Sequence, residues 1–400
     1  MSTSSPTTYD VADAAFWKNP YEQYAAMRRD APLVRIDPGG IWAATRYDTV
    51  MEVLARPEVF SSAGLQAIMQ PAWLEDNPLA RSLLVKDPPE HTVLRSIVRN
   101  VFTPRRIASY EPALRAKVDQ LLDSAGGRSL DFVADLGLPV PATMAGWLLG
   151  LDPEHALRYK RWSDAIAEIG LVAPDDVERQ QHIIGLLREM DAFVGEVLDD
   201  RFTTERDDLV GTLIRSETDG RRLTREEVRC FLFLLLAAGL ETTVGAIGGA
   251  GFMLSERPDV HARLRADRSL VPAFVDEVLR YLGPVHGTYR VVSRDTTLGG
   301  ADLPSGSFVL LLMASASRDD ACVPDGDSFN IDRPRTNSLN FPFGHGIHFC
   351  LGAALARLEA QVVVEAVVDR YERLDRVPDA LEWNNSVQTR GLRRLELSAG

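Results

Sequence analysis

A single cysteine lies in a glycine-rich segment that could hold a reactive thiolate. The segment runs from Phe343 to Gly352 and reads FGHGIHFCLG, with Cys350 near its end and the helix-forming sequence AALARLE directly after it. A thiolate at a helix start is stabilised by the helix dipole and by free backbone N–H groups. Gly344 permits backbone shapes that other residues avoid, and Gly352 leaves room for a flat group. This geometry suits a thiolate ligand of haem iron; a buried free cysteine in a glycine-rich turn is the alternative.

A second segment with chemical potential lies in the middle of a long apolar stretch. Ala238 and Gly239 make the chain thin there, and Glu241 and Thr242 follow with a carboxylate and a hydroxyl. Such a pair could deliver protons to oxygen bound at iron. The alternative is a small-residue packing notch in which the threonines bond back to their own helix. The residues alone leave both interpretations open.

Two pairs of charged or basic residues lie at helical spacing. Glu277 and Arg280 are three residues apart among apolar neighbours, which favours a partly buried ion pair over a surface pair of little energetic value. His91 and Arg95 follow the sequence DPPE and lie one helical turn apart on one face. Taken singly, each of these last two would be a solvated surface residue.

The full spacing Phe-Gly-x-Gly-x-His-x-Cys-x-Gly resembles the haem-binding signature of the cytochrome P-450 family, in its soluble bacterial branch. The resemblance covers nearly all of the chain. It implies a mainly α fold with small β-sheets (α+β), with haem between the long core helix and the helix after the cysteine loop. It also implies that residues 1–19 form a flexible tail and residues 20–400 a single catalytic domain. The chain departs from the family pattern at Ser317, where asparagine is commoner, and at Glu241, where aspartate is more frequent.

The resemblance implies roles for individual residues. Cys350 is the axial ligand of haem b (heme b), and Glu241 with Thr242 forms the oxygen-activation pair. The other haem contacts implied are Ala238, Phe343, Gly344 and Gly352, with the propionates held by His91, Arg95, Arg290 and His348. A structural ion cluster consists of Glu277, Arg280 and Arg333, and loss of one partner would leave a buried unpaired charge and prevent haem incorporation. Loop placement and the resemblance give a candidate substrate pocket of Leu65, Ile68, Met69, Leu171, Leu234, Val285, His286 and Val387.

The activity implied is that of a haem-thiolate monooxygenase. It would insert one oxygen of O₂ into a C–H bond of a hydrophobic terpenoid, steroid, aromatic or polyketide, with epoxidation or O-dealkylation as variants. Electrons would come from a separate ferredoxin and ferredoxin reductase that uses NAD(P)H. Arg95, Arg99, Arg105 and Arg106 form a basic run without an acid, which suits an acidic donor, although a merely solvated basic face is the alternative. A peroxide-driven haem peroxygenase and a non-catalytic haem-binding or sensor protein also remain open.

Composition limits the class of protein. The 400 residues carry a formal net charge of −13 with 45% hydrophobic residues, which argues against nucleic-acid or anionic-membrane binding. Three scattered cysteines indicate a reducing compartment, and the first residues carry no targeting pattern, so we expect a cytoplasmic monomer. The apolar stretch 231–254 is long enough to span a membrane, but Glu241 at its centre would cost about 2.5–3.5 kcal/mol there. We therefore interpret it as a buried core helix.

Hydrophobic periodicity, capping residues and turn residues predict the elements. The box at Thr224 and Glu227 predicts the start of the core helix, which should end near Glu256 before Pro258. A hairpin is expected at 33–45 and strands at 289–293, 307–313 and 392–397. Residues 61–85 are expected to form a long irregular loop. The other predicted helices span 20–29, 47–55, 90–101, 107–124, 139–150, 156–167, 176–202, 260–267, 272–281 and 351–371.

Overall fold

The computed structural model describes residues 7–399 apart from 128, 151–154, 335–340 and 387. The chain forms two compact units, each assembled from three separate stretches. Unit 1 comprises Met1–Gly64, Pro272–Cys350 and Trp383–Gly391, and unit 2 comprises Leu65–Val271, Leu351–Glu382 and Leu392–Gly400. Neither unit is a continuous piece of sequence. The single catalytic domain over 20–400 remains a prediction.

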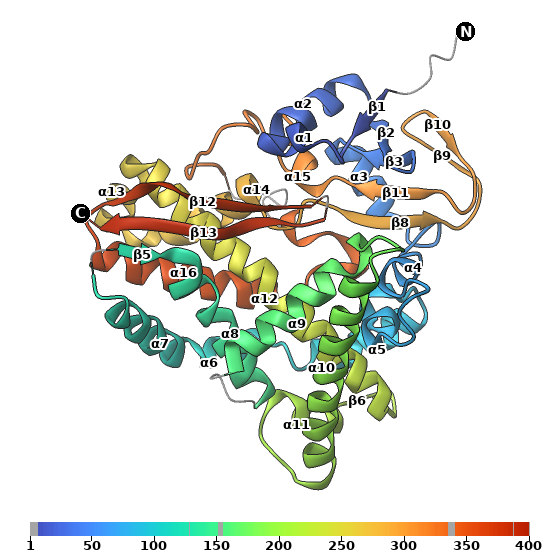
Figure 1. The fold of residues 1–400 in the computed structure, drawn as a ribbon, viewed down its shortest axis with the longest axis horizontal. Coiled ribbons are helices and arrows are strands. Elements are labelled where there is room, and N and C mark those ends of the chain that lie inside the picture. The colour runs from blue at the N-terminus through green and yellow to red at the C-terminus, as the bar shows by residue number, and fades with distance from the viewer. Residues whose placement is uncertain (1–6, 128, 151–154, 335–340, 387, 400) are drawn as a thin grey trace. The chain divides into compact units, whose positions relative to one another are not determined.

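Unit 1 is built on a six-stranded sheet with strand order β1-β2-β3-β11-β8-β4 (Figure 1). Its strands are β1 (Thr8–Asp10), β2 (Leu33–Asp37), β3 (Ile41–Ala44), β4 (Phe60–Ser61), β8 (Thr288–Val292) and β11 (Phe308–Leu311). The predicted hairpin is β2 and β3, in which Leu33 lies opposite Ala44. Gly39 and Gly40 in its turn have φ of 101° and 56°, which glycine adopts readily. A second hairpin consists of β9 (Thr296–Leu298) and β10 (Ala301–Leu303).

Helices cover this sheet and bury two apolar clusters against it. They are α1 (Ala14–Lys18), α2 (Pro20–Asp30), α3 (Tyr47–Ala55) and α15 (Met313–Ala316). The unit also contains most of α14 (Val271–Leu282). The expected flexible tail 1–19 differs from the structure over its described part. There β1 pairs in parallel with β2, and α1 buries Phe16 in the cluster around Tyr24. A buried aromatic residue anchors this segment to the fold.

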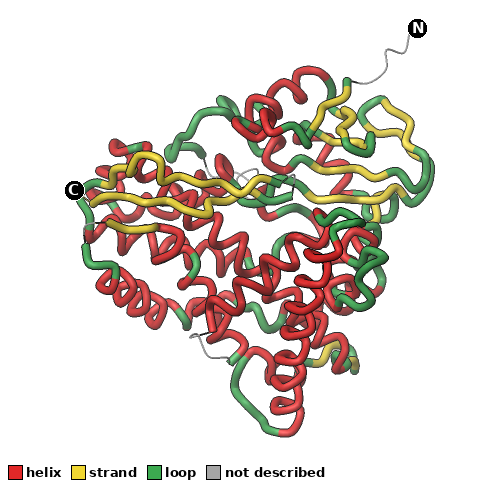
Figure 2. Tube along the Cα trace, in the orientation of Figure 1, coloured by secondary structure: helices red, strands yellow, loops and turns green. Residues whose placement is uncertain are grey.

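Unit 2 is mainly helical, as the red helices of Figure 2 show. Its helices are α4 (Leu65–Met69), α5 (Glu90–Arg99), α6 (Pro104–Ser109), α7 (Glu111–Ser124), α8 (Pro139–Leu149), α9 (Ala156–Glu168), α10 (Val177–Thr203), α11 (Leu209–Arg215), α12 (Arg225–Glu256), α13 (Pro258–Ala266) and α16 (Ala353–Arg370). The predicted helix 107–124 is wrong as one element. It is divided at Tyr110 into α6 and α7, because Pro112 lacks the N–H that would bond to the carbonyl of Ala108 and instead occupies the first turn of α7. The expected loop 61–85 also contains short ordered turns, among them α4.

Helix α12 is the central element of unit 2. The predicted capping box is present: Glu227 N donates to Thr224 Oγ1 (3.2 Å), and Thr224 N donates to Glu227 Oε2 (2.8 Å). The helix packs against α8, α9, α10, α16 and the π-helical turn η3 (Phe132–Gly137). Two stretches, Phe132–Leu149 and Arg225–Glu256, are long and apolar enough to cross a membrane, but most of each is buried inside the fold. That burial is what a core helix requires.

The strands near the C-terminus extend beyond the prediction. A three-stranded sheet has the order β12-β13-β5, from β12 (Leu374–Asn385), β13 (Arg390–Ala399) and β5 (Ser129–Asp131). Strand β12 was not predicted, because its residues are largely polar and Pro378 interrupts the strand pattern. A small hairpin of β6 (Glu217–Thr218) and β7 (Arg221–Arg222) precedes α12.

Candidate functional site

The cysteine loop of unit 1 is a compact turn closed by backbone hydrogen bonds. Cys350 N donates to Phe343 O (2.8 Å), and Phe349 N donates to Gly346 O (3.1 Å). The side chain of Cys350 is exposed. Helix α16 begins at Ala353 with Gly352 as its N-cap residue, so the cysteine precedes the helix by two residues more than the sequence predicted. The loop therefore presents the thiol outward from a fixed backbone.

Two glycines of this loop have conformations that other residues avoid. Gly344 has φ of 83° and Gly346 has φ of 70°. An added Cβ at Gly346 would also lie 3.1 Å from Leu54 O, which is tighter than an ordinary contact. Both positions therefore need glycine for the turn to close as it does. Gly352 has open space around it, because an added Cβ there meets nothing within 4 Å.

Two of the residues predicted to bind the haem propionates, His348 and Arg290, lie in unit 1 and contact other protein groups. His348 Nε2 lies 3.0 Å from Ser62 Oγ, and Arg290 is buried with its Nη1 donating to Tyr289 O (2.7 Å). Ser62 was not among the predicted site residues, because it lies 286 residues from its partner in the sequence and has no distinguishing local pattern. These contacts fix the orientation of the two basic side chains.

The structure brings Glu277, Arg280 and Arg333 together in a buried cluster. Arg280 donates from Nε and Nη2 to the two oxygens of Glu277, each at 2.7 Å, and Arg333 Nε donates to Glu277 Oε1 (3.1 Å). Arg280 also donates to three backbone carbonyls, those of Ser317, Gly326 and Ser328. Ser317 therefore contributes its carbonyl, which is independent of side-chain identity and accounts for tolerance of serine there. Every charge in the cluster has a partner.

In unit 2, the middle of α12 has an open strip. The helix is otherwise largely buried, but Ala238 and Gly239 are exposed, and an added Cβ at Gly239 meets nothing within 4 Å. The flanking residues Leu236 and Leu240 are buried. A strip this thin, bounded by apolar packing, is a surface against which a flat group can lie.

The two polar residues beside the strip are half-buried. Thr242 Oγ1 donates to Ala238 O at 2.7 Å, which is the back-bonding that the packing-notch alternative predicted. The hydroxyl proton is thereby directed along the helix, while the lone pairs of the oxygen remain available to accept a hydrogen bond. Ser163 Oγ of α9 donates to the neighbouring carbonyl of Ala237 (3.3 Å). Glu241 lies beside this group of carbonyls and hydroxyls.

His91 and Arg95 lie on α5 of unit 2, one turn apart as predicted. His91 is buried, and burial followed by the positive charge of Arg95 lowers the pKa of His91 to about 4. The imidazole is therefore neutral at pH 7 and donates one N–H. A neutral donor and a fixed cation in adjacent turns form a donor set that suits a carboxylate group.

The candidate pocket residues fall into separate places. Leu65, Ile68 and Met69 form α4, which packs against the short turn η5 (Ile169–Leu171), where Leu171 is 56% exposed. An added Cβ at Gly170 would lie 2.9 Å from Ile68 Cγ2, so these two loops are in close contact. Leu234 on α12 and Val285 before β8 are half-buried. Val387 lies outside the described residues.

His286 does not suit the pocket role that we assigned to it. It is fully buried, with Nδ1 at 3.0 Å from Tyr24 OH and Nε2 at 3.4 Å from Tyr21 OH. Burial and then the charges of Arg390 and Arg318 lower its pKa well below the ordinary value. A neutral ring enclosed by two tyrosines has no polar atom to offer a substrate. The helical periodicity of α2 was the only sequence signal for Tyr24.

Each unit carries features that suit a haem-thiolate protein. In unit 1, an exposed cysteine on a glycine-fixed loop would suit the thiolate ligand of a haem. In unit 2, taken by itself, the open strip on the core helix would suit a flat ring. Residues 175–393 match the sequence model of the family described as "Cytochrome P450".

Comparison with known proteins places the chain in that family. The chain is 35% identical to the erythromycin C-12 hydroxylase of Saccharopolyspora erythraea, covering 94% of this chain and 93% of that protein. It is 32% identical to the vitamin D(3) 25-hydroxylase of Pseudonocardia autotrophica, covering 100% and 98%. The solved structure of cytochrome P450 CYP109Q5 from Chondromyces apiculatus aligns with TM-score 0.89 at 36% identity, covering 98% of each chain. The chain belongs to the cytochrome P450 family and is a haem-thiolate monooxygenase.

Proposed function

We propose that this monooxygenase hydroxylates a bulky, largely apolar molecule of the steroid or macrolide type. The observation that carries the proposal is the open strip at Ala238 and Gly239 with Glu241 and Thr242 beside it. Two relatives are named for erythromycin and vitamin D(3), both large, mostly hydrophobic ring systems. Between Ser61 and Ala80 the sequence has no lysine or arginine, which weakens the case for a substrate carboxylate in that loop.

Each residue has a definite part in this proposal. Cys350 would ligate the haem iron through its thiolate, and the bound haem would supply the chemistry of dioxygen activation. His91, Arg95, Arg290 and His348 are the residues that would hold the propionates. These assignments follow from the donor set and from the family.

Proton handling is assigned to the middle of α12. The Thr242 hydroxyl donates a hydrogen bond to Ala238 O, so its oxygen can accept a hydrogen bond from a donor on the open side of the helix. Glu241, one residue before it, is half-buried and exchanges its proton with water. The pair would thereby pass protons toward the open strip.

Electrons are proposed to come from a separate acidic ferredoxin. Helix α6, with Arg105 and Arg106, packs against α16, which carries Arg357. Arg99 and Arg105 are exposed, whereas Arg106 donates to Thr212 Oγ1 at 3.0 Å and is partly engaged. A basic face on a protein of net charge −13 suits an acidic partner at low ionic strength. We place the enzyme in the cytoplasm with its donor.

The test is the absorption spectrum of the purified, reduced protein under carbon monoxide. We expect a strongly red-shifted Soret band that is lost in Cys350→Ala and kept in Cys322→Ala. Product formation from steroid or macrolide probes should then need a ferredoxin, its reductase and NAD(P)H. Turnover with hydrogen peroxide alone, at equal rate and without the reductase, would favour the peroxygenase. Haem binding without turnover of any probe would favour a sensor.

A further inference from the structure

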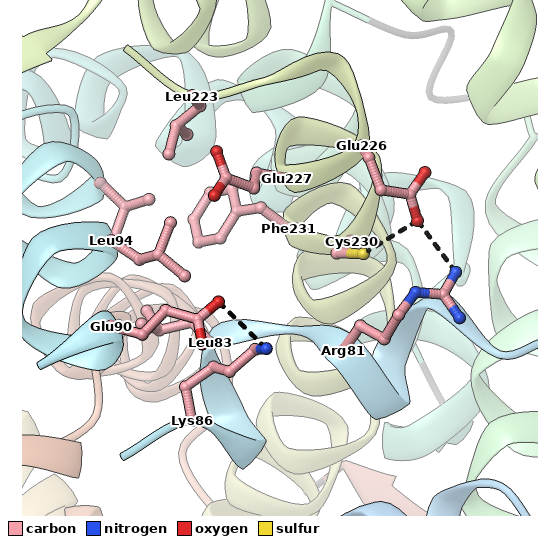
Figure 3. A pocket seen from close by; sticks show the side chains of 11 residues that line it. Arg81, Leu83, Lys86, Glu90, Leu94, Leu223, Glu226, Glu227, Cys230 and Phe231 are labelled. Carbon is pink, nitrogen blue, oxygen red and sulfur yellow. Dashed lines mark hydrogen bonds and ion pairs between the residues drawn. The ribbon is translucent and has the colours of Figure 1, made fainter. Parts of the chain in front are cut away.

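A cavity of about 180 Å³ lies in unit 2 (Figure 3). It is bounded by the first two turns of α12, by α5 and by the turn η2 (Leu83–Val85), and part of it is open to solvent. Its apolar walls are formed by Leu83, Leu94, Val98, Leu223 and Phe231, together with the thiol of Cys230. The described residues that line it include none of those assigned to catalysis or haem binding.

Polar groups around the cavity are engaged with one another. Lys86 Nζ pairs with Glu90 at 3.0 Å, and Arg81 Nη2 pairs with Glu226 at 2.9 Å, as the dashed lines of Figure 3 show. The Cys230 thiol donates to Glu226 Oε1 at 3.5 Å. Glu227, the remaining acid of the lining, accepts from Thr224 N in the capping box. A charged ligand would have to break one of these pairs to gain a partner.

The thiol in the wall is not a reactive group. Cys230 is 4% exposed, and burial followed by the charge of Glu226 raises its pKa to about 12. It therefore behaves as a small apolar residue of the wall rather than as a nucleophile. Covalent capture is accordingly not the function of this site.

Size and wall chemistry together identify the occupant. An engineered cavity of roughly 150 Å³ lined by Leu, Ile and Phe stays dry and binds benzene or xenon. The cavity here is slightly larger, and its lining combines apolar side chains with charged side chains that are paired with other protein groups. We propose that it is a binding site for a small neutral apolar molecule, of the size of one substituted ring.

The cavity is lined by two helices of the same unit, α5 and α12, that also carry residues assigned to haem binding and oxygen activation. Leu94 and Val98 contact the cavity from α5, and His91 and Arg95 lie on the adjacent face of that helix. Cys230 and Phe231 lie about two turns before Ala238 on α12. An occupant therefore packs against both helices that carry the predicted oxygen-activation and propionate residues.

The first experiment is to expose crystals of the haem-loaded protein to xenon. We expect a xenon atom among Leu94, Val98 and Phe231, in addition to any atom near the haem. Phe231→Leu enlarges the cavity and should increase the occupancy. Ordered waters in the cavity with no xenon would overturn the proposal.

The second experiment compares two probes of one shape, benzene and benzoate, with the iron blocked by 4-phenylimidazole. Benzene should bind the wild-type protein with a measurable heat, and Cys230→Phe, which fills the cavity, should weaken this binding at least tenfold. Phe231→Leu should retain it, which keeps the test decisive if Cys230→Phe fails to fold. Benzoate should not bind, since every charge around the cavity has a partner. Benzoate binding as tight as that of benzene, or benzene binding unaffected by Cys230→Phe, would contradict the proposal.

Discussion

Two stretches of α12 use small residues for opposite purposes. At Gly239, in the middle of the helix, an added Cβ would meet nothing within 4 Å. At Gly251, three turns later, an added Cβ would lie 2.6 Å from the ring of the fully buried Phe132. The first glycine leaves a surface open, against which we propose that haem lies, and the second lets η3 approach the helix. The same residue type in the same helix therefore leaves open space in one place and permits close packing in the other.

The largest expected effect concerns Glu359 of α16, which packs against α12. Its carboxyl is fully buried, and its Oε2 has no hydrogen-bond partner among the residues that the structure describes. Burial raises its pKa from 4.5 to about 8. The pKa of this carboxyl is higher in the folded state than in the unfolded state. The free energy of unfolding therefore falls as pH rises from about 4.5 to about 8, and this carboxyl causes no further fall above about pH 8. The loss is on the order of a few kcal/mol.

Replacing Glu359 by Gln tests whether the Glu359 carboxyl is shielded from water in the folded protein. We expect Glu359→Gln to raise the melting temperature relative to wild type at pH 9 and much less at pH 5. Glu372→Gln, at an exposed position soon after α16, should show no such pH dependence. An equal difference between Glu359→Gln and wild type at both pH values would mean that the carboxyl is hydrated.

Next in size is the substitution of the packed glycine. Gly251→Ala forces the Phe132 ring to move and should lower the free energy of unfolding by about 1–3 kcal/mol. Gly248→Ala is the matched control, because its Cβ would meet Leu392 and Val133 at ordinary distances of 3.5 and 3.6 Å. The control should be neutral or stabilising by up to about 1 kcal/mol. Urea unfolding of both variants measures the difference, and equal losses would refute the assignment.

Substitution of the glycine in the open strip should give a smaller change of the opposite sign. Gly239→Ala should stabilise the haem-free protein by roughly 0.5–1 kcal/mol, since alanine favours helix and no clash follows. Gly239→Leu should leave the haem-free fold intact but reduce the haem bound per chain. Thermal unfolding and the ratio of Soret to protein absorbance report the two effects. Full haem loading of Gly239→Leu would show that haem does not lie on this strip.

The smallest effect on stability is expected at Thr242. Thr242→Val removes the hydrogen bond to Ala238 O, which should cost about 1 kcal/mol or less. Product formed per NAD(P)H consumed should nevertheless fall, whereas Thr242→Ser should preserve it. If valine and serine variants couple equally well, the hydroxyl serves only the helix.

Local signals in the sequence predicted some elements to the residue. Helix α3 begins at Tyr47 and ends at Ala55 as predicted, and the capping box placed the start of α12. The break at Tyr110 was not predicted, because the helical pattern of apolar residues continues across it. Strand β12 was not predicted, because its polar residues resemble those of a loop. Residue types likewise indicated Cys350 and the Glu241–Thr242 pair, but they could not give partners such as Ser62.

The sequence by itself determined the chemistry of this protein: a thiol among glycines, a thin helix segment with an acid and a hydroxyl, and the family to which these belong. Only the tertiary structure decided which glycine faces open space and which faces Phe132, that His286 is enclosed by tyrosines, and that a cavity lies beside Cys230. The physical reason is that motifs depend on neighbours along the chain, whereas burial depends on which distant segments pack around a side chain.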